Sequence, residues 1–310
     1  MDKNIASIDT ALVDGDVITY LSGFGAERVQ YKLYPSEDTT GEPLFVGSYR
    51  KELDAAIEEL GLEEYVVSRE METDPIEYAL QKCKLILEKI QAHTGCKRMQ
   101  LYLSGPDNFR KDIATYRKYK GNRDLSKRPQ WYDAIRNYMI QYWGANVIKG
   151  QEADDILGIA QCKMNAEGTA SIICSTDKDL LQIPGLHYNL SKETITEQDA
   201  QSALDIFYTQ CLTGDSTDNI VGCPGIGPKK AAGILEEAAD PWQAIVEGYR
   251  EQLKKKCPND INFDGEDTLE YAHWDTTKEL TITKSIEEFA LEMAQLVYIR
   301  QKPNEIWEPL

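Results

Sequence analysis

Four short apolar runs lie along the chain, and acidic residues follow each of them. Each run has the length of a buried β-strand. The runs are Thr10–Val13, Met99–Leu103, Ala145–Ile148 and Ala170–Cys174. Because this arrangement occurs four times, it predicts four strands whose following carboxylates act together at one site.

Patterns with the period of an α-helix separate the runs, at Asp74–Ala92, Pro129–Trp143 and Asp154–Met164. Strands that alternate with helices predict an α/β fold with a parallel central sheet flanked by helices. In such sheets, ligands bind beyond the carboxyl ends of the strands. We therefore expect acidic residues from distant parts of the sequence to converge on one edge of the sheet.

Beyond about residue 195 the pattern turns helical, which predicts a second, smaller lobe over 196–310 beside a domain over 1–195. Its helical segments are Gln198–Leu212, Lys229–Ala239, Trp242–Lys255 and Ser285–Ile299. Residues 28–80 are less regular. They predict a hairpin around Pro35–Pro43 and a helix over Lys51–Leu60, and no chemistry is assigned to them.

Nine acidic residues after the strands or in turns form one candidate set. They are Asp14, Asp107, Glu152, Asp154, Asp155, Asp177, Asp179, Asp215 and Asp218. Two carboxylates about 4 Å apart repel by about 4 kcal/mol at an effective dielectric of about 20, so a shared pocket needs cations. Oxygen ligands without His or Cys favour Mg²⁺ or Mn²⁺ over zinc. Two such ions together promote phosphodiester hydrolysis.

Helix capping is the plain alternative for Glu152, Asp154 and Asp155, which head a predicted helix. Each charge at a helix N-terminus stabilises the helix by about 0.3 to 1 kcal/mol. Capping accounts for one or two of these acids. It leaves the acids that follow the other three runs unexplained.

The net charge of −18 disfavours a nucleic-acid partner, because phosphate binding relies on Lys and Arg. Residues 109–128, however, carry eight Lys or Arg and only two Asp. A solvated helix face is the plain reading of this segment, and a contact to phosphates is the other. Tyr116, Tyr119 and Trp131 lie among or beside these charges and are candidates to stack on bases, with core packing favoured for Trp131.

The stretch GDSTDNIVGCPGIGPKKAAGIL is the most specific in the sequence. Gly225 and Gly227 lie in a tight turn, and Pro228 takes the first position of a helix. This predicts a helix-hairpin-helix over about 212–237, in which backbone N–H groups and a helix N-terminus meet a phosphate. Lys229 and Lys230 add positive charge at the same point.

These motifs together resemble the 5′ nuclease family of flap endonucleases and 5′→3′ exonucleases, found in phages and at the N-terminus of bacterial DNA polymerase I. The resemblance rests on LVDGD, YRKYKGNRD, EADD, STDKDLLQ and GDSTDNI…GIGPKKA, and covers nearly the whole chain. The phage-encoded single-domain members are the most similar. The resemblance implies a PIN-like fold with a helical arch over about 108–130.

The same resemblance implies roles for individual residues. Lys120 and Arg123 contact the scissile phosphate, Asp154 is catalytic, and Tyr119 stacks on a base. Arg110 begins the basic arch that covers the DNA strand. Two Mg²⁺ or Mn²⁺ ions are implied, with a monovalent cation at the helix-hairpin-helix. The first ion is assigned Asp14, Asp107, Glu152, Asp154 and Asp155, and the second Asp177, Asp179, Asp215 and Asp218.

The implied function is hydrolysis of DNA at or near 5′ ends in phage replication or recombination. Substrates would be 5′ flaps, 5′ ends of duplexes and RNA–DNA hybrids, and the balance of exonuclease and flap endonuclease stays open. One alternative is a structure-specific DNA-binding protein with a degenerate metal site, which the complete acid set disfavours. Another is a PIN-type ribonuclease, which should lack both the helix-hairpin-helix and the arch.

Seven scattered cysteines form no CxxC pair, and no His cluster accompanies them. This pattern favours a reducing compartment and offers no zinc site. The first residues show no signal-peptide pattern, and no segment reaches the roughly 20 apolar residues that span a bilayer. We expect a monomer in the cytoplasm, the host's if a phage encodes the protein, and no membrane partner.

Overall fold

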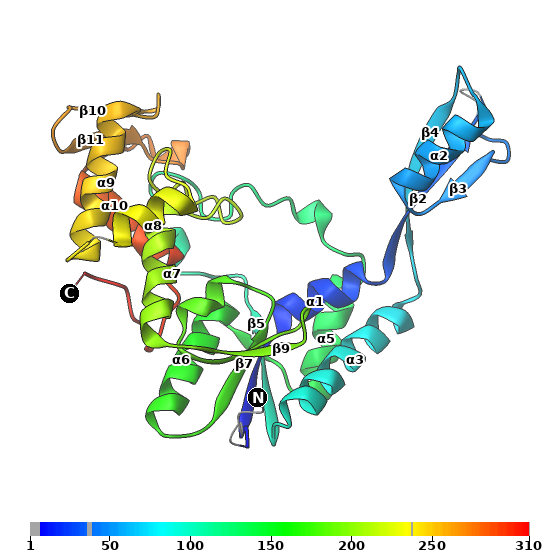
Figure 1. The fold of residues 1–310 in the computed structure, drawn as a ribbon, viewed down its shortest axis with the longest axis horizontal. Helices are drawn as coiled ribbons and strands as arrows, with labels where there is room; N and C mark the ends of the chain where they lie inside the picture. Colours follow the sequence, from blue (N-terminus) through cyan, green and yellow to red (C-terminus); the bar gives the residue numbers. More distant parts are fainter. Residues whose placement is uncertain (1–6, 36–38, 237, 310) are drawn as a thin grey trace. The chain divides into compact units, whose positions relative to one another are not determined.

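The structure is a computed structural model that describes residues 7–35, 39–236 and 238–309. By its internal contacts the chain divides into two compact units (Figure 1). Unit 1 comprises Met1–Asp16, Ile90–Ser126 and Gly144–Leu310. Unit 2 comprises Val17–Lys89 and Lys127–Trp143. No helix among the described residues combines the length and the apolar character needed to cross a bilayer.

A six-stranded sheet forms the centre of unit 1. Five strands run parallel, and only β9 is antiparallel to its neighbour. This confirms the predicted α/β fold with a mainly parallel sheet, and the four apolar runs form β1, β5, β6 and β7. In spatial order the strands are β6 (Asn146–Ile148), β5 (Arg98–Ser104), β1 (Thr10–Asp14), β7 (Ser171–Ser175), β8 (Gly185–Asn189) and β9 (Thr194–Gln198).

Helix α6 (Ala153–Ala166) packs on the middle of this sheet (Figure 1). Leu157 of α6 meets Leu12 of β1 and Ile173 of β7 in a buried apolar cluster. Burial of β1 and β7 along their whole length explains their largely apolar character, which is typical of parallel strands, whereas two of the three residues of β6 at the sheet edge are exposed. Because β1, β5, β6 and β7 are parallel, their carboxyl ends, with the acids that follow, lie at one edge of the sheet.

Four helices and a small sheet form the lobe after β9 (Figure 1). The helices are α7 (Ala200–Thr213), α8 (Pro228–Glu236), α9 (Pro241–Lys255) and α10 (Ile286–Val297). They agree with the four predicted segments to within three residues. The antiparallel strands β10 (Ile261–Phe263), β11 (Thr268–Ala272) and β12 (Thr281–Ser285) and the 3-10 turns η2 (Asp179–Gln182) and η3 (Thr276–Lys278) were not predicted. A boundary at residue 195 stays a prediction, because this lobe shares unit 1 with the central sheet.

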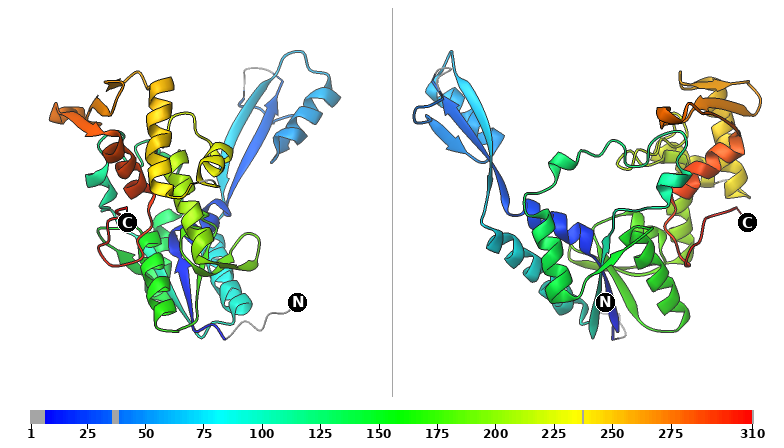
Figure 2. Two further views of the ribbon diagram at one scale, coloured as in Figure 1. Left: turned by 60° about the vertical axis from the view of Figure 1, so that its left-hand side comes forward. Right: turned by 180° about the vertical axis from the view of Figure 1, so that it is seen from behind.

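Unit 2 contains a three-stranded antiparallel sheet in the order β3, β2, β4 (Figure 2). Helix α2 packs against β2 and β3, and Leu53 of α2 and Leu33 of β2 are both buried. The predicted hairpin is confirmed as the β2–β3 pair, with residues 36–38 outside the described part of the chain. The helices and strands that lie wholly or mainly in unit 2 are α1 (Gly15–Phe24), β2 (Glu27–Tyr34), β3 (Phe45–Gly47), α2 (Arg50–Leu60), β4 (Val66–Thr73), α3 (Ile76–Thr94) and α5 (Tyr132–Trp143).

The basic segment does not form the expected helical arch. Over 108–130 the structure has one turn of helix, α4 (Arg110–Ile113), and one 3-10 turn, η1 (Leu125–Lys127). Between them the chain is irregular and packs into the core of the lobe, where Tyr116 and Tyr119 are both buried. The packing of Tyr116 and Tyr119 in the core fixes the position of this segment, although most of it is not helical.

A buried ion pair ties α4 to the head of α6. Both terminal nitrogens of Arg110 donate to the two carboxylate oxygens of Asp155, each at 2.8 Å. Arg110 also donates to the backbone carbonyls of Leu296 and Tyr298, at the end of α10. Arg110 is 3% exposed and Asp155 fully buried, so each charge depends on the other for its compensation.

Replacing Arg110 by Met leaves the buried carboxylate of Asp155 without its partner. We expect the free energy of unfolding to fall by about 3 to 5 kcal/mol, measured by urea denaturation. Lys111→Met is the matched control, because the exposed Lys111 only donates to the carbonyl of Pro106. A loss in the Arg110 variant no greater than in this control would show that the pair does not stabilise the fold.

A second prediction concerns the loop between α7 and α8. Gly222 has a φ of +62°, and a Cβ there would clash with the backbone nitrogen of Gly214. We expect Gly222→Ala to destabilise the α7–α8 pair by about 1 to 3 kcal/mol, seen as faster amide hydrogen exchange in these helices. Gly227→Ala is the control, since no atom lies within 4 Å of its Cβ position. Equal exchange rates in the two variants would contradict the close approach.

Candidate active site

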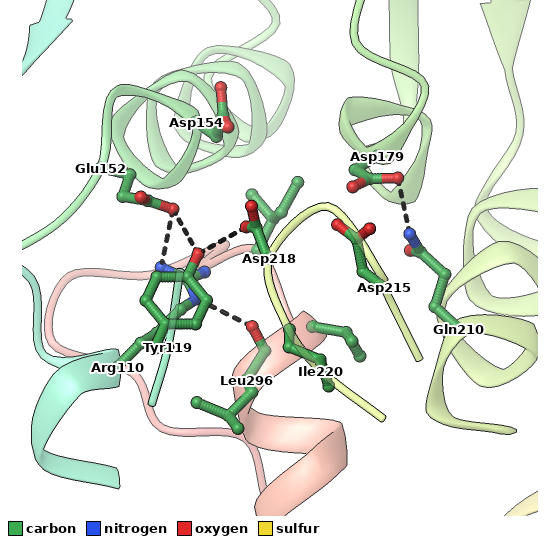
Figure 3. A pocket seen from close by; sticks show the side chains of 12 residues that line it. Arg110, Tyr119, Glu152, Asp154, Asp179, Gln210, Asp215, Asp218, Ile220 and Leu296 are labelled. Atoms are coloured by element: carbon green, nitrogen blue, oxygen red, sulfur yellow. Dashed lines mark hydrogen bonds and ion pairs between the residues drawn. The ribbon is translucent and has the colours of Figure 1, made fainter. Parts of the chain in front are cut away.

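One pocket of unit 1 collects residues from the head of α6, the turn η2 and the loop after α7 (Figure 3). Five of its lining residues are carboxylates that the sequence singled out. Its lining residues are Arg110, Tyr119, Glu152, Asp154, Asp179, Gln210, Asp215, Asp218, Ile220, Leu296, Val297 and Ile299. The predicted convergence of distant acids is therefore found for Glu152, Asp154, Asp179, Asp215 and Asp218.

Two further predicted acids act on this pocket through their charge. Asp14 is buried at the end of β1, where its Oδ2 accepts a hydrogen bond of 2.6 Å from Ser175. Burial raises the pKa of Asp154 well above its usual range, and the nearby charges of Asp14 and Asp177 raise it further. Seven of the nine predicted acids thus belong to one electrostatic cluster.

The two predicted acids of the β7–β8 connection, Asp177 and Asp179, also have raised pKa values. Desolvation raises the pKa of Asp177, and the charges of Asp218 and Asp215 contribute. Desolvation, followed by Asp177 and Asp215, raises the pKa of Asp179 to about 6, although Gln210 Nε2 donates to Asp179 at 2.6 Å. Negative charge is in excess here, so an added cation would be stabilised.

Cations of the basic segment neutralise the other side. Lys120 Nζ forms an ion pair with Glu152 and lies 3.4 Å from Asp218 Oδ2. A terminal nitrogen of Arg123 donates to Asp218 Oδ1 at 2.6 Å. Burial by itself would raise the pKa of Glu152, but the charges of Lys120 and Arg110 outweigh it and the pKa is lowered. Lys120 and Arg123 therefore contact acids that line the pocket, and their contact with a scissile phosphate stays a prediction.

Hydrogen bonds to the loop after α7 hold Lys120 in position. The backbone N–H of Lys120 donates to the carbonyl of Asp218 at 2.8 Å, and the side chain of Asn122 donates to the carbonyl of Ser216 at 2.7 Å. Asn219 donates back to the carbonyl of Lys118 at 2.9 Å. Lys120 has a φ of +55°, a left-handed conformation that is costly for a lysine and that these contacts compensate.

Tyr119 differs from its predicted role. Its ring is only 6% exposed, and its hydroxyl lies 2.8 Å from both Glu152 Oε2 and Asp218 Oδ2 (Figure 3). Burial raises the pKa of Tyr119 well above its usual range, with Glu152 adding to the effect, so the hydroxyl keeps its proton. A buried ring cannot stack on a base, and Tyr119 instead joins two acids that come from different segments.

Three other predicted residues also differ from their predicted roles. Asp155 was expected to bind metal, but both its oxygens are engaged by Arg110 and by the backbone N–H groups of Glu152 and Arg300. Asp107 is exposed in the loop after β5 and does not line the pocket. Arg110 was expected to contact DNA, yet it is almost completely buried in the wall of the pocket, where it pairs with Asp155.

The acids fit a hard divalent cation by chemical type, since the cluster offers carboxylate oxygens without His or Cys. Their oxygens are not gathered into a ready-made set. No three His, Cys, Asp or Glu side chains in residues 7–35, 39–236 and 238–309 form a group that could hold a metal ion as placed here. The reason is visible in the contacts, because Glu152 and Asp218 turn toward Lys120, Arg123 and Tyr119.

The loop between α7 and α8 has the geometry expected of a helix-hairpin-helix. Helix α8 begins at Pro228, as predicted. Gly225 has a φ of +72°, and Lys230 Nζ donates to its carbonyl at 3.1 Å. Gly225, Gly227, Lys229 and Lys230 are all exposed, so their backbone and charges are accessible to a ligand. Contact with DNA stays a prediction for these four residues.

Sequence reasoning missed Gln210. It lies on α7 between the buried Phe207 and Cys211, and it joins Gln182 to Asp179 through two side-chain hydrogen bonds. A polar residue inside the apolar stripe of a helix was the signal that could have revealed it. Gln210 fixes the orientation of an acid that faces the pocket.

Residues 63–206 match the family model described as "5′-3′ exonuclease, N-terminal resolvase-like domain". DNA polymerase I of Rhizobium leguminosarum is 36% identical over 147 residues, which cover 43% of this chain and 14% of that protein. The 5′-3′ exonuclease of Buchnera aphidicola subsp. Schizaphis graminum is 32% identical over 149 residues, 44% of this chain and 51% of that one. The chain thus spans from about a seventh to half of the length of these curated relatives.

Among solved structures, a phage T5 D15 protein co-crystallised with metal ions is similar with a TM-score of 0.47 at 14% identity, over 77% of this chain and 78% of that one. A T5 5′-exonuclease mutant has a TM-score of 0.46 at 12% identity, over 94% of this chain and 87% of that one. The family model includes β5, β6, β7, α6 and the acids from Asp107 to Asp179. The resemblance to the 5′ nuclease family that the motifs indicated is therefore confirmed over residues 63–206.

Proposed function

We propose that this protein is a metal-dependent 5′ nuclease that hydrolyses phosphodiester bonds of DNA at or near 5′ ends. The observation that carries the proposal is the pocket itself. Carboxylates from β1, α6, the β7–β8 connection and the α7–α8 loop converge there, and two basic side chains of one segment contact them. Excess negative charge beside fixed positive charge suits a site that binds metal cations and a phosphate together.

Two groups of acids would hold Mg²⁺ or Mn²⁺. Asp14, Glu152 and Asp154 form one group, and Asp177, Asp179, Asp215 and Asp218 form the other. A pair of divalent ions supplies an activated water and stabilises charge on the attacking and leaving oxygens. Asp107 and Asp155 are left out, the first because it is exposed away from the pocket and the second because Arg110 already neutralises it.

Lys120 and Arg123 would exchange partners when substrate binds. In the structure they neutralise Glu152 and Asp218, and a phosphate oxygen offers them an equivalent negative partner. Hydrogen bonds to the α7–α8 loop hold the segment that carries Lys120 and Arg123. Both side chains could therefore stabilise the negative charge that builds up on the phosphate during hydrolysis. Glu152 and Asp218 would then be free to hold a metal ion. In the structure Lys120 and Arg123 neutralise these two acids.

The exposed hairpin at Gly225–Lys230 would hold duplex DNA through its backbone N–H groups and two lysines, with a monovalent cation as a further ligand of this turn. Contacts of this kind bind phosphates without reading sequence. Proposed substrates are 5′ flaps, 5′ ends of duplexes and RNA–DNA hybrids, acted on by a monomer during phage replication or recombination. A labelled flap with a free or a blocked 5′ end separates exonucleolytic from endonucleolytic cutting.

A DNA-binding protein without catalysis is the second candidate. One observation favours it, because two of the nine expected acids do not face the pocket. The other seven acids form a cluster that a surface for DNA binding does not require. Their negative charge repels phosphate unless cations neutralise it. A nuclease requires these acids for cleavage of DNA, whereas a protein that only binds DNA does not cleave it with or without them.

Asp154→Ala and Asp177→Ala should each abolish cleavage of a labelled 5′-flap DNA in Mg²⁺, because each removes an acid of the cluster. EDTA should do the same to the native protein. Asp205→Ala is the matched control, since Asp205 is an exposed acid of α7 bonded only to Gln201 of its own helix. Cleavage by the Asp154 or Asp177 variant at the control's rate would exclude the metal-dependent mechanism.

Lys120→Met should lower kcat by about a hundredfold or more, as loss of one transition-state contact does, with a small effect on DNA affinity. Lys118→Met should retain activity, because Lys118 belongs to the same segment but lies over the ring of Trp274. The cleavage rates of the two variants are compared in single-turnover experiments with saturating enzyme. A weaker affinity with unchanged kcat in the Lys120 variant would assign it to binding alone.

A further inference from the structure

A second, larger hollow lies in unit 1 between the β7–β8 connection and the β8–β9 hairpin. Its volume is about 440 Å³, within the range of small-molecule pockets. Leu181 contributes partly exposed apolar surface to its lining, whereas Ile173 borders the hollow but is only 1% exposed. Like the acid cluster, it lies where parallel strands end, because β7 ends at Ser175 and β8 at Asn189, and both residues line it.

Most of the remaining lining is polar, and its two lysines outnumber its one acid, Asp177. Thr176, Thr194 and Thr196 contribute hydroxyl groups, and Lys178 and Lys192 contribute ammonium groups. Both lysines are exposed. In a chain with a net charge of −18, hydroxyls and amines around an apolar floor are suited to an anion that carries an uncharged body.

The hollow shares a wall with the acid cluster. Asp177 lines it, and the same side chain is electrostatically linked to Asp154, Asp215 and Asp218 of the candidate active site. Its backbone N–H donates to Ser175 Oγ, which in turn donates to Asp14. A ligand in the hollow would therefore lie against the connection that carries Asp177 and Asp179.

We propose that this hollow binds one nucleotide of the DNA strand, next to the phosphate that is cut. Lys178 and Lys192 hold a backbone phosphate, the threonine hydroxyls meet phosphate or sugar oxygens, and the sugar and base cover Leu181. These contacts involve the backbone and an apolar surface, so any base is accepted. The inference rests on the proposed function, and it adds a subsite on the β8–β9 side of the acids.

The test uses thymidine 5′-monophosphate as the probe and EDTA to prevent turnover. Chemical-shift titration of the ¹⁵N-labelled full chain should move the amides of Thr176–Lys178 and of the β8–β9 hairpin. Lys192→Glu should weaken the binding of this nucleotide and of a 5′-flap DNA by about tenfold each, as loss of a charge-assisted hydrogen bond does. Thr196→Tyr, which occupies the hollow from β9, should weaken both in the same way.

Lys163→Glu is the matched control, because Lys163 is an exposed lysine of α6 that pairs only with Glu167 and lies outside the hollow. It should leave both affinities unchanged, and melting temperatures should show that all three variants are folded. Thymidine without its phosphate should bind more weakly. The proposal is overturned if the nucleotide shifts no amide of the hairpin, or if Lys192→Glu weakens nucleotide binding without weakening DNA binding. Both readouts are independent of catalysis, so an inactive protein would refute the proposed function and leave this test intact.

Discussion

Repulsion between carboxylates is the constraint on which the rest of this structure depends. The parallel sheet brings the ends of β1, β6 and β7 to one edge, and the α7–α8 loop adds two more acids there. Such a cluster is unfavourable unless positive charge is supplied. The chain supplies part of it through the segment that carries Lys120 and Arg123, and it leaves Asp154, Asp177 and Asp179 with raised pKa values.

The fold was predictable where one local pattern decides the outcome. β1 and β7 read as strands because buried parallel strands are apolar throughout, and α7 to α10 read as helices from their period. The prediction of a helical arch over 108–130 was wrong for a physical reason. The charges of this segment suggested an exposed arch, but Tyr116 and Tyr119 pack into the lobe, and only tertiary contacts could show that.

The site was predictable as a set and less so residue by residue. Position after a strand identifies an acid near the sheet edge, but it does not say which way the side chain turns. Glu152, Ala153, Asp154 and Asp155 are consecutive, and the helix directs Asp154 to the pocket and Asp155 to a buried arginine. Arg110 and Lys120 belong to the same basic segment, and the sequence alone does not indicate that Arg110 is buried against Asp155 while Lys120 is partly exposed and pairs with Glu152.

The hydrogen bonds between Lys118–Asn122 and Ser216–Asn219 have a mechanical consequence. The backbone of Lys120 is hydrogen-bonded to that of Asp218, so this cation and the acid beside it cannot shift independently. The α7–α8 loop also leads directly into the exposed glycines and lysines that precede and begin α8. A displacement of that turn would therefore reach Lys120 through the backbone of the loop and the hydrogen bond from Lys120 to Asp218, so the exposed turn and the pocket are mechanically linked.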